Sequence, residues 1–232
     1  MSNHQSYQRF AAVAAIVSFL FALASNVLQG IPVNFSSEVF TNPAFMLSVG
    51  PNGASLLRWG MILDMLGYYL PLLPVALFLQ LWCGSRNPVW IQFFTVCGLG
   101  YILIGASGAA TLAAVHPPLI TAYAQASIAQ RAVLETIFTT LWNMVYGGLW
   151  NILGELLVGI WFFGIGWCLR SERRLFSVFS MILGLAALLD SLGMILNVAA
   201  LGMPGLILYL GLAPIWALWL GIDLLRKPVL IS

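Results

Sequence analysis

Three acidic residues, Asp64, Glu155 and Asp190, lie inside long apolar stretches of the sequence. A charged side chain at the centre of a bilayer costs about 2.5–3.5 kcal/mol on insertion scales. Each acid therefore needs a proton, a hydrogen-bonding partner, a cation or water. Two interpretations stay open at this stage: the acids fix helix packing, or they form a site for a proton, a cation or a cationic ligand.

The depth of these acids in their apolar stretches is similar. Glu155, Asp190 and Asp64 lie 14, 15 and 18 residues from the more basic ends of their stretches, or about 21–27 Å at about 1.5 Å per helical residue. Asn151 precedes Glu155 by four residues and Asn197 follows Asp190 by seven, so each asparagine shares a helix face with an acid. We expect these five side chains to line a polar pocket that opens to the outside.

Arg58 is the positive charge nearest to these acids in the predicted arrangement, at the outer end of the second apolar stretch. We expect it to pair with one of them or to gate the pocket. The remaining residue types exclude several other kinds of site. With two histidines, one lysine and three cysteines outside any C-x-x-C pair, we predict no metal site and no cofactor. An enzyme is the less favoured alternative, since only carboxylates are present as acid and base.

The composition determines which elements can position these residues. Of 232 residues, 61% are hydrophobic and only 7% are charged, whereas soluble domains have about 25% charged residues. The chain cannot build a water-soluble surface, and in a lipid bilayer only helices or closed barrels satisfy their backbone groups. Long unbroken apolar runs favour helices. We predict one all-α, polytopic transmembrane bundle, and a net charge of +2 gives no indication of nucleic-acid binding.

Six apolar runs predict six spans, over about 10–28, 57–82, 89–115, 146–169, 175–201 and 205–225. An amphipathic helix over about 119–143 is expected to lie at the membrane interface. The first run has an alternative interpretation, because Ala22-Leu23-Ala24 has the small-x-small form of a signal-peptidase site. We favour an uncleaved first span.

The distribution of basic residues predicts the orientation. Seven of nine lie on one side of the predicted topology, which makes both termini cytoplasmic. These seven are Arg9, Arg86, Arg170, Arg173, Arg174, Arg226 and Lys227. The expected location is the bacterial cytoplasmic membrane. Tryptophans near the span ends, among them Trp82 and Trp150, are expected to form an interfacial belt.

Small residues are concentrated in two of the predicted spans, and prolines interrupt another. The third and fourth spans are rich in glycine, which lets helix backbones approach closely. Pro71 and Pro74 interrupt the second span, and prolines inside a span kink it and free a backbone carbonyl. They indicate either simple packing or a broken helix that lines a pathway.

The stretch "LLRWGMILDML" resembles the opening of the second span in a bacterial six-helix membrane family catalogued only as a domain of unknown function. Its pattern L-x-R-x-G-x3-D is matched by Leu56, Arg58, Gly60 and Asp64. The stretch from Leu156 to Gly193 is also similar to that family, but the basic loop differs, reading "RRLFSVFS" where the family tends to read "lPr.lG". The resemblance implies six spans and no activity.

Together these features predict binding or translocation of a small solute or ion through an outward-facing pocket, coupled to protonation of the carboxylates. The alternative is a structural or accessory subunit whose glycine-rich third and fourth spans dock another membrane protein or a second copy of the chain.

Overall fold

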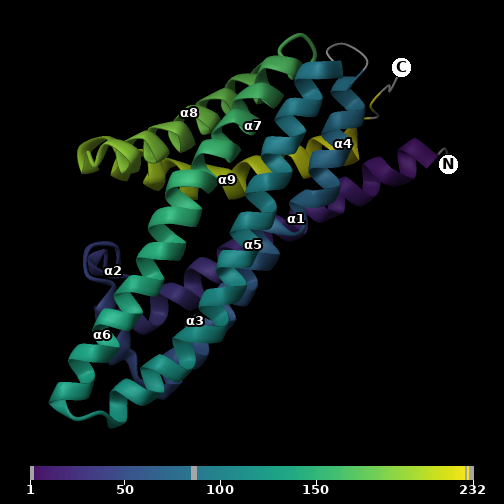
Figure 1. Ribbon diagram of the computed structural model, residues 1–232. Helices are drawn as coiled ribbons and strands as arrows, with labels where there is room; N and C mark the ends of the chain where they lie inside the picture. Colours follow the sequence, from purple (N-terminus) through teal and green to yellow (C-terminus); the bar gives the residue numbers. More distant parts are fainter. Residues whose placement is uncertain (1–2, 85–87, 228, 230–232) are drawn as a thin grey trace.

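The computed structural model describes residues 3–84, 88–227 and 229, and every regular element in these ranges is a helix. Six helical segments there are long and apolar enough to cross a membrane, which confirms the predicted all-α, multi-pass architecture (Figure 1). The segments are α1 (Asn3–Gly30); α3 (Gly50–Asp64) with η3 (Met65–Tyr69) and α4 (Leu72–Gly84); α5 (Pro88–Gln125); α6 (Ile128–Trp142) with η4 (Asn143–Gly154) and α7 (Glu155–Leu169); α8 (Arg174–Leu196); and α9 (Ala199–Arg226). Three short helices connect α1 to α3, namely η1 (Ile31–Val33), α2 (Glu38–Thr41) and η2 (Pro43–Val49).

The segment predicted as an interfacial helix, residues 119–143, is divided between two long helices. α5 continues through Pro117 and Pro118 into this segment. Prolines usually end a helix, but here Leu112 before them and Ile120 after them are both fully buried in one apolar cluster. Packing on both sides therefore keeps the two halves of α5 in line.

The break between α5 and α6 falls at residues 126–127, and Ser127 precedes the first residue of α6. The backbone N–H of Ser127 donates to Gln130 Oε1 at 2.9 Å, as in a capping box. The predicted single helix was wrong because the capping box at Ser127 and Gln130 starts a new helix within this segment.

The fifth and sixth spans also meet at a different residue from the one predicted. α8 ends at Leu196, before the "GMPG" stretch, and the next residue, Asn197, has a left-handed φ of 56°. Asparagine tolerates this conformation and commonly follows the last residue of a helix. Pro204 lies inside α9 instead of between two helices.

The first turns of α1, the end of α4, the turn after α7 and the end of α9 meet at one end of the bundle. Gln8 Nε2 of α1 donates to the Leu224 carbonyl of α9 at 2.6 Å. Trp82 of α4 donates to Glu172, in the turn after α7, at 3.1 Å. We call this the basic end, because most of the described lysines and arginines gather here. They are Arg9, Arg170, Arg173, Arg174, Arg226 and Lys227, while Arg86 lies outside the described residues.

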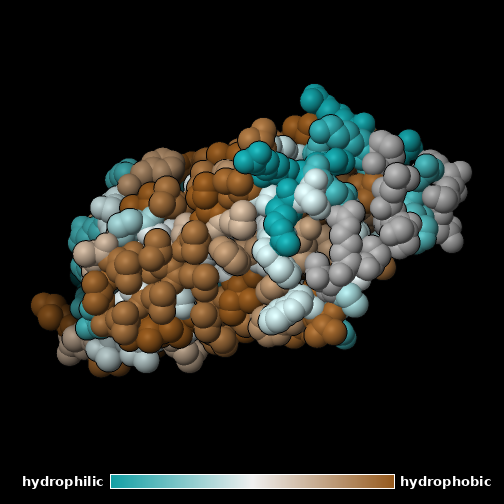
Figure 2. Space-filling view, turned by 90° about the horizontal axis from the view of Figure 1, so that it is seen from above, coloured by the Kyte–Doolittle hydropathy of each residue, from teal (hydrophilic) through white to brown (hydrophobic). Residues whose placement is uncertain are grey.

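The surface follows the same division. In Figure 2, hydrophilic residues gather toward the end where the termini lie, and hydrophobic residues cover most of the remaining visible face. Such a surface matches a protein whose sides contact lipid and whose basic end contacts water and headgroups.

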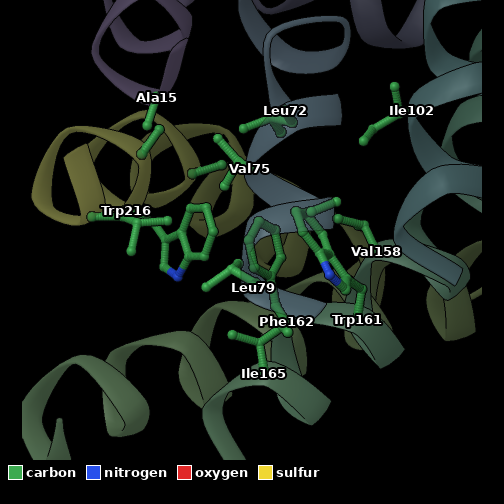
Figure 3. Close-up of a cluster of buried hydrophobic side chains, with 14 of the residues drawn as sticks. Ala15, Leu72, Val75, Leu79, Ile102, Val158, Trp161, Phe162, Ile165 and Trp216 are labelled. Carbon is green, nitrogen blue, oxygen red and sulfur yellow. The ribbon is translucent and has the colours of Figure 1, made fainter. Parts of the chain in front are cut away.

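The main apolar core, here the bundle core, lies between α1, α4, α5, α7, α8 and α9. Figure 3 shows its centre, where the rings of Trp161, Phe162 and Trp216 lie together. The centroids of Phe162 and Trp216 are 4.7 Å apart, and Trp216 Nε1 donates to Ser180 Oγ at 2.8 Å. The one polar atom of Trp216 is thus satisfied, and this region is closely packed.

A second apolar core, here the outer core, lies toward the other end. It gathers buried side chains of η2, α3, α5 and α6, among them Leu47, Leu57 and Phe138. α5 has 38 residues and is about 57 Å long at about 1.5 Å per residue. Even with a tilt of about 40°, the helix would span about 44 Å along the membrane normal, more than a bilayer's hydrocarbon thickness of about 30 Å. One part of α5 must therefore extend past the hydrocarbon, together with the elements packed on it.

Candidate functional site

A cavity of about 310 Å³ lies where the bundle core and the outer core meet. Asp64 and Glu155 line its inner part with Tyr209 of α9. The other side is formed by the segment around Phe35 and Phe40, which are exposed on the surface of the molecule. The cavity therefore connects two buried carboxyl groups with the surface near α2, away from the basic end.

Two π-helical segments place the acids at this cavity. Asp64 is the last residue before η3, and Glu155 is the first residue after η4. The bond from Leu70 N to the Met65 carbonyl, 3.0 Å long, spans five residues, as a π-turn requires. Such wide turns are rare and are frequent at functional sites. They also bring ring and amide side chains to the cavity wall, namely Tyr68, Tyr69, Tyr146, Trp150 and Asn151.

Pro71 accounts for part of the irregularity next to η3. A residue at this position with an N–H would bond to the Gly67 carbonyl four residues earlier, and proline has no N–H. The Ser18 hydroxyl of α1 donates to the Gly67 carbonyl instead. Tyr101 OH of α5 likewise donates to the Tyr68 carbonyl at 3.3 Å. Neighbouring helices thus supply hydrogen-bond donors to backbone carbonyls next to Pro71.

Asp64 is buried but incompletely hydrogen-bonded. It is 8% exposed, and its Oδ1 lies 3.4 Å from Ser25 Oγ. The single hydroxyl proton of Ser25 also has a closer acceptor, the Gly60 carbonyl at 3.0 Å. Oδ2 of Asp64 has no partner among the described residues. A charged carboxylate in this position lacks the bonds that would offset its desolvation.

Glu155, which lines the same cavity, is in a similar position. It is 5% exposed, and its Oε2 has no hydrogen-bond partner within the described ranges. Asn151, one turn earlier and also buried, lines the same cavity, as predicted from the spacing. Asp190 of α8 is close enough to Glu155 for the two charges to interact. Two carboxylates this close repel one another, so a proton or a cation is favoured nearby.

Asp190 lies behind the cavity and not in its wall. It is 2% exposed and faces α9, where a Cβ added at Gly202 would lie 3.4 Å from Asp190 Oδ1. The three predicted acids are therefore brought into one region, with two of them at the cavity surface and the third next to Glu155.

Arg58 and Asn197 lie outside the site, contrary to the prediction. Arg58 is exposed on α3 and does not line the cavity. It precedes Asp64 by six residues, or about 240° around the helix, and so lies on another face. Asn197 is exposed in the turn between α8 and α9, where its left-handed backbone ends α8. Its structural role explains the residue type without any ligand.

The aromatic lining was not predicted. Trp150 was expected in an interfacial belt, but its Nε1 donates to the Gly105 carbonyl of α5 at 3.2 Å and its ring faces the cavity. Trp82 was assigned to the same belt and is buried against Glu172. The spacing of four between Trp142, Tyr146 and Trp150 was the available indication of an aromatic stripe.

Among the described residues, no lysine or arginine lines the cavity beside the acids. Nor is any group of three His, Cys, Asp or Glu side chains in those ranges placed to hold a metal ion. The chemistry available to a ligand is therefore negative charge from two carboxyl groups, amides and aromatic rings.

Comparisons with models of known protein families, with curated proteins and with solved structures find no match to this chain. An account of function therefore has to start from the geometry of this site.

Proposed function

We propose that this multi-pass membrane protein binds a small solute or ion in the cavity and presents it to, or carries it across, the bilayer. Asp64 and Glu155 are the binding groups, and Asn151 supplies hydrogen bonds. One observation carries the proposal: two buried carboxyl groups face a cavity open to the surface, and each keeps an oxygen without a protein partner. Structural acids in a membrane protein are instead expected to be paired.

The orientation in this proposal follows from the charges. Six of the eight described lysines and arginines lie at the basic end with both termini, and Arg58 and Arg131 lie toward the other end. Cytoplasmic loops carry the excess of such residues. The termini are thus cytoplasmic, the cavity opens to the outside, and the membrane is the bacterial cytoplasmic one. The resemblance at Arg58 and Asp64 to a six-helix bacterial family fits this assignment and adds no activity.

The alternative, an accessory subunit that docks a partner through its glycine-rich spans, receives no support from the packing. A Cβ at Gly98 would lie 2.7 Å from the Trp161 ring. A Cβ at Gly159 would lie 2.9 Å from the Gly184 carbonyl. These glycines are used for close contacts inside the chain, so a partner or a second copy has to bind other surfaces.

Charge-selective labelling tests the proposal. Asn151→Cys is made in a variant whose native cysteines are alanine, and right-side-out vesicles are treated with membrane-impermeant cationic or anionic methanethiosulfonates. We expect the trimethylammonium reagent to react at least about tenfold faster than the sulfonate, since the carboxylates attract cations in a low-dielectric site. The ratio falls toward one when Asp64→Asn and Glu155→Gln are added.

Thr121→Cys is the matched control, because Thr121 is exposed on α5 and does not line the cavity. The ratio of the two rates at position 121 should equal that for a small free thiol, and the ratios at position 151 are expressed relative to it. Absence of labelling at position 151 from the outside, or a relative ratio of one there, would refute the proposed site.

A further inference from the structure

The cavity is larger than a site for a bare ion. Its volume is about 310 Å³, whereas one water molecule takes about 30 Å³ in the liquid. Pockets for small organic molecules begin at about 300 Å³. The cavity therefore has room for an organic molecule of several heavy atoms in contact with its walls.

Aromatic rings form a continuous side of this cavity. The centroids of Tyr69 and Trp150 are 6.3 Å apart, and those of Trp150 and Tyr146 are 6.4 Å apart. Tyr68 and Tyr209 line the cavity as well. A cation within about 6 Å of an aromatic face is attracted by the ring quadrupole, and the attraction increases when water is excluded.

The polar atoms of three of these rings, those of Tyr68, Tyr209 and Trp150, already have partners in the protein. Tyr68 OH accepts a hydrogen bond from Asn26 Nδ2 at 3.0 Å. The hydroxyl of Tyr209 is hydrogen-bonded to that of Tyr101, and Trp150 Nε1 is bonded to a backbone carbonyl of α5. These groups are therefore not free to neutralise the acids, and the wall offers a ligand mainly ring faces.

The charge requirement and the wall chemistry exclude most ligand classes. Ionised Asp64 and Glu155 disfavour an anion, and a neutral ligand would leave the ionised acids without a counter-charge. A divalent cation such as Ca²⁺ or Mg²⁺ takes six or more oxygen ligands in its coordination shell, and no group of three His, Cys, Asp or Glu side chains within the described ranges is placed to hold a metal ion. An ammonium group with carbon substituents satisfies the acids and the rings together.

We propose that the ligand of this cavity is an organic cation, whose ammonium group lies between Asp64 and Glu155 and whose carbon substituents contact the rings of Tyr69, Tyr146 and Trp150. This inference rests on the proposed function and specifies the class of solute. It predicts that charge and apolar surface both contribute to affinity.

Calorimetric titration of the full chain in detergent tests the ligand class with matched probes. Choline and 3,3-dimethylbutan-1-ol have the same shape and differ in charge. We expect choline to bind at least about tenfold more tightly than the alcohol, and benzyltrimethylammonium to bind more tightly than choline through its added ring. Sodium chloride at equal ionic strength should produce no saturable heat.

Variants at Tyr146 separate the ring from its hydroxyl. Tyr146→Phe keeps the ring face and should weaken choline binding much less than loss of the ring does. Tyr146→Leu should weaken binding about tenfold. Asp64→Asn and Glu155→Gln should each weaken it at least as much, while Arg58→Gln, outside the cavity, should leave it unchanged.

The outcomes distinguish this inference from the function on which it rests. Equal binding of choline and the alcohol, no binding of either ammonium probe, or equal effects of Tyr146→Phe and Tyr146→Leu would each overturn the organic-cation assignment. If charge-selective labelling at position 151 persisted in any of these cases, the cavity would remain a site for another solute. If the labelling were lost too, both proposals would fail.

Discussion

The acidic residues at the basic end of the bundle differ from those at the cavity in their hydrogen bonds and ion pairs. At the basic end, Asp223 accepts from Arg173 at 2.9 Å and from Lys227 at 3.1 Å. Glu172 in the neighbouring turn accepts from Trp82 at 3.1 Å. At the cavity, Asp64 and Glu155 are more deeply buried and yet keep unpartnered oxygens.

This difference separates acids that hold helices together from acids that are kept for a ligand. A partly buried pair stabilises the fold because each charge has the other as its counter-ion. A buried carboxyl group without a partner costs free energy and persists only if something else requires it. Packing differs in the same way. The bundle core is filled by aromatic rings, whereas a cavity lies where the bundle core meets the outer core.

The largest expected effect compares these two kinds of packing. Phe162→Ala removes a fully buried ring from the bundle core and should lower the free energy of unfolding by about 3–5 kcal/mol. Tyr146→Ala should cost clearly less, because one side of Tyr146 already borders the cavity. Equilibrium unfolding in mixed micelles measures both, and similar losses would mean that the cavity wall is packed as tightly as the core.

Removal of a paired acid should have the next largest effect. Asp223→Asn leaves Arg173 and Lys227 without their counter-ion and should lower the free energy of unfolding by about 1–2 kcal/mol, between exposed and buried pairs. The measurement should be repeated at high salt, where the loss shrinks. A variant as stable as the unmodified chain would remove the contrast between the two ends.

A smaller effect tests how the proline break is compensated. Ser18→Ala removes the donor to the Gly67 carbonyl and should cost about 1 kcal/mol. In a Pro71→Ala background the restored N–H bonds to that carbonyl, so the same substitution should cost less than about 0.5 kcal/mol. Equal costs in both backgrounds would show that Pro71 does not free this carbonyl.

The smallest effect is expected at Arg58, which was predicted to belong to the site and lies outside the cavity. Arg58→Gln should change the free energy of unfolding by less than about 0.5 kcal/mol, as expected for an exposed side chain without a fixed partner. The labelling ratio at position 151 should also stay the same. A marked change in that labelling ratio would show that Arg58 belongs to the site.

Apolar run length was sufficient to predict the six long helices. It did not locate the break at Ser127, because the rule that prolines end helices is overridden where Leu112 and Ile120 are buried on both sides. Only a check for capping patterns such as Ser127 and Gln130 would have found it.

The acidic residues of the candidate site could be predicted from the sequence, whereas the aromatic rings that line the cavity could not. Intramembrane carboxyl groups are identified by type alone, and Asn151 by its helical spacing from Glu155. The ring lining depends on π-turns in η3 and η4, which have no reliable pattern in a single sequence. The position of Arg58 depended on which face of α3 packs inward, which run length does not determine.

The central claim is that the acids of the cavity are retained for a ligand and not for the fold. The free energy of unfolding of the double variant Asp64→Asn, Glu155→Gln, without added ligand, tests this most directly. We predict a value equal to or above that of the unmodified chain, because two desolvated carboxyl groups become neutral amides of nearly the same shape. A decrease of about 3 kcal/mol or more, as expected when a buried charge pair is broken, would contradict the claim and identify these acids as structural.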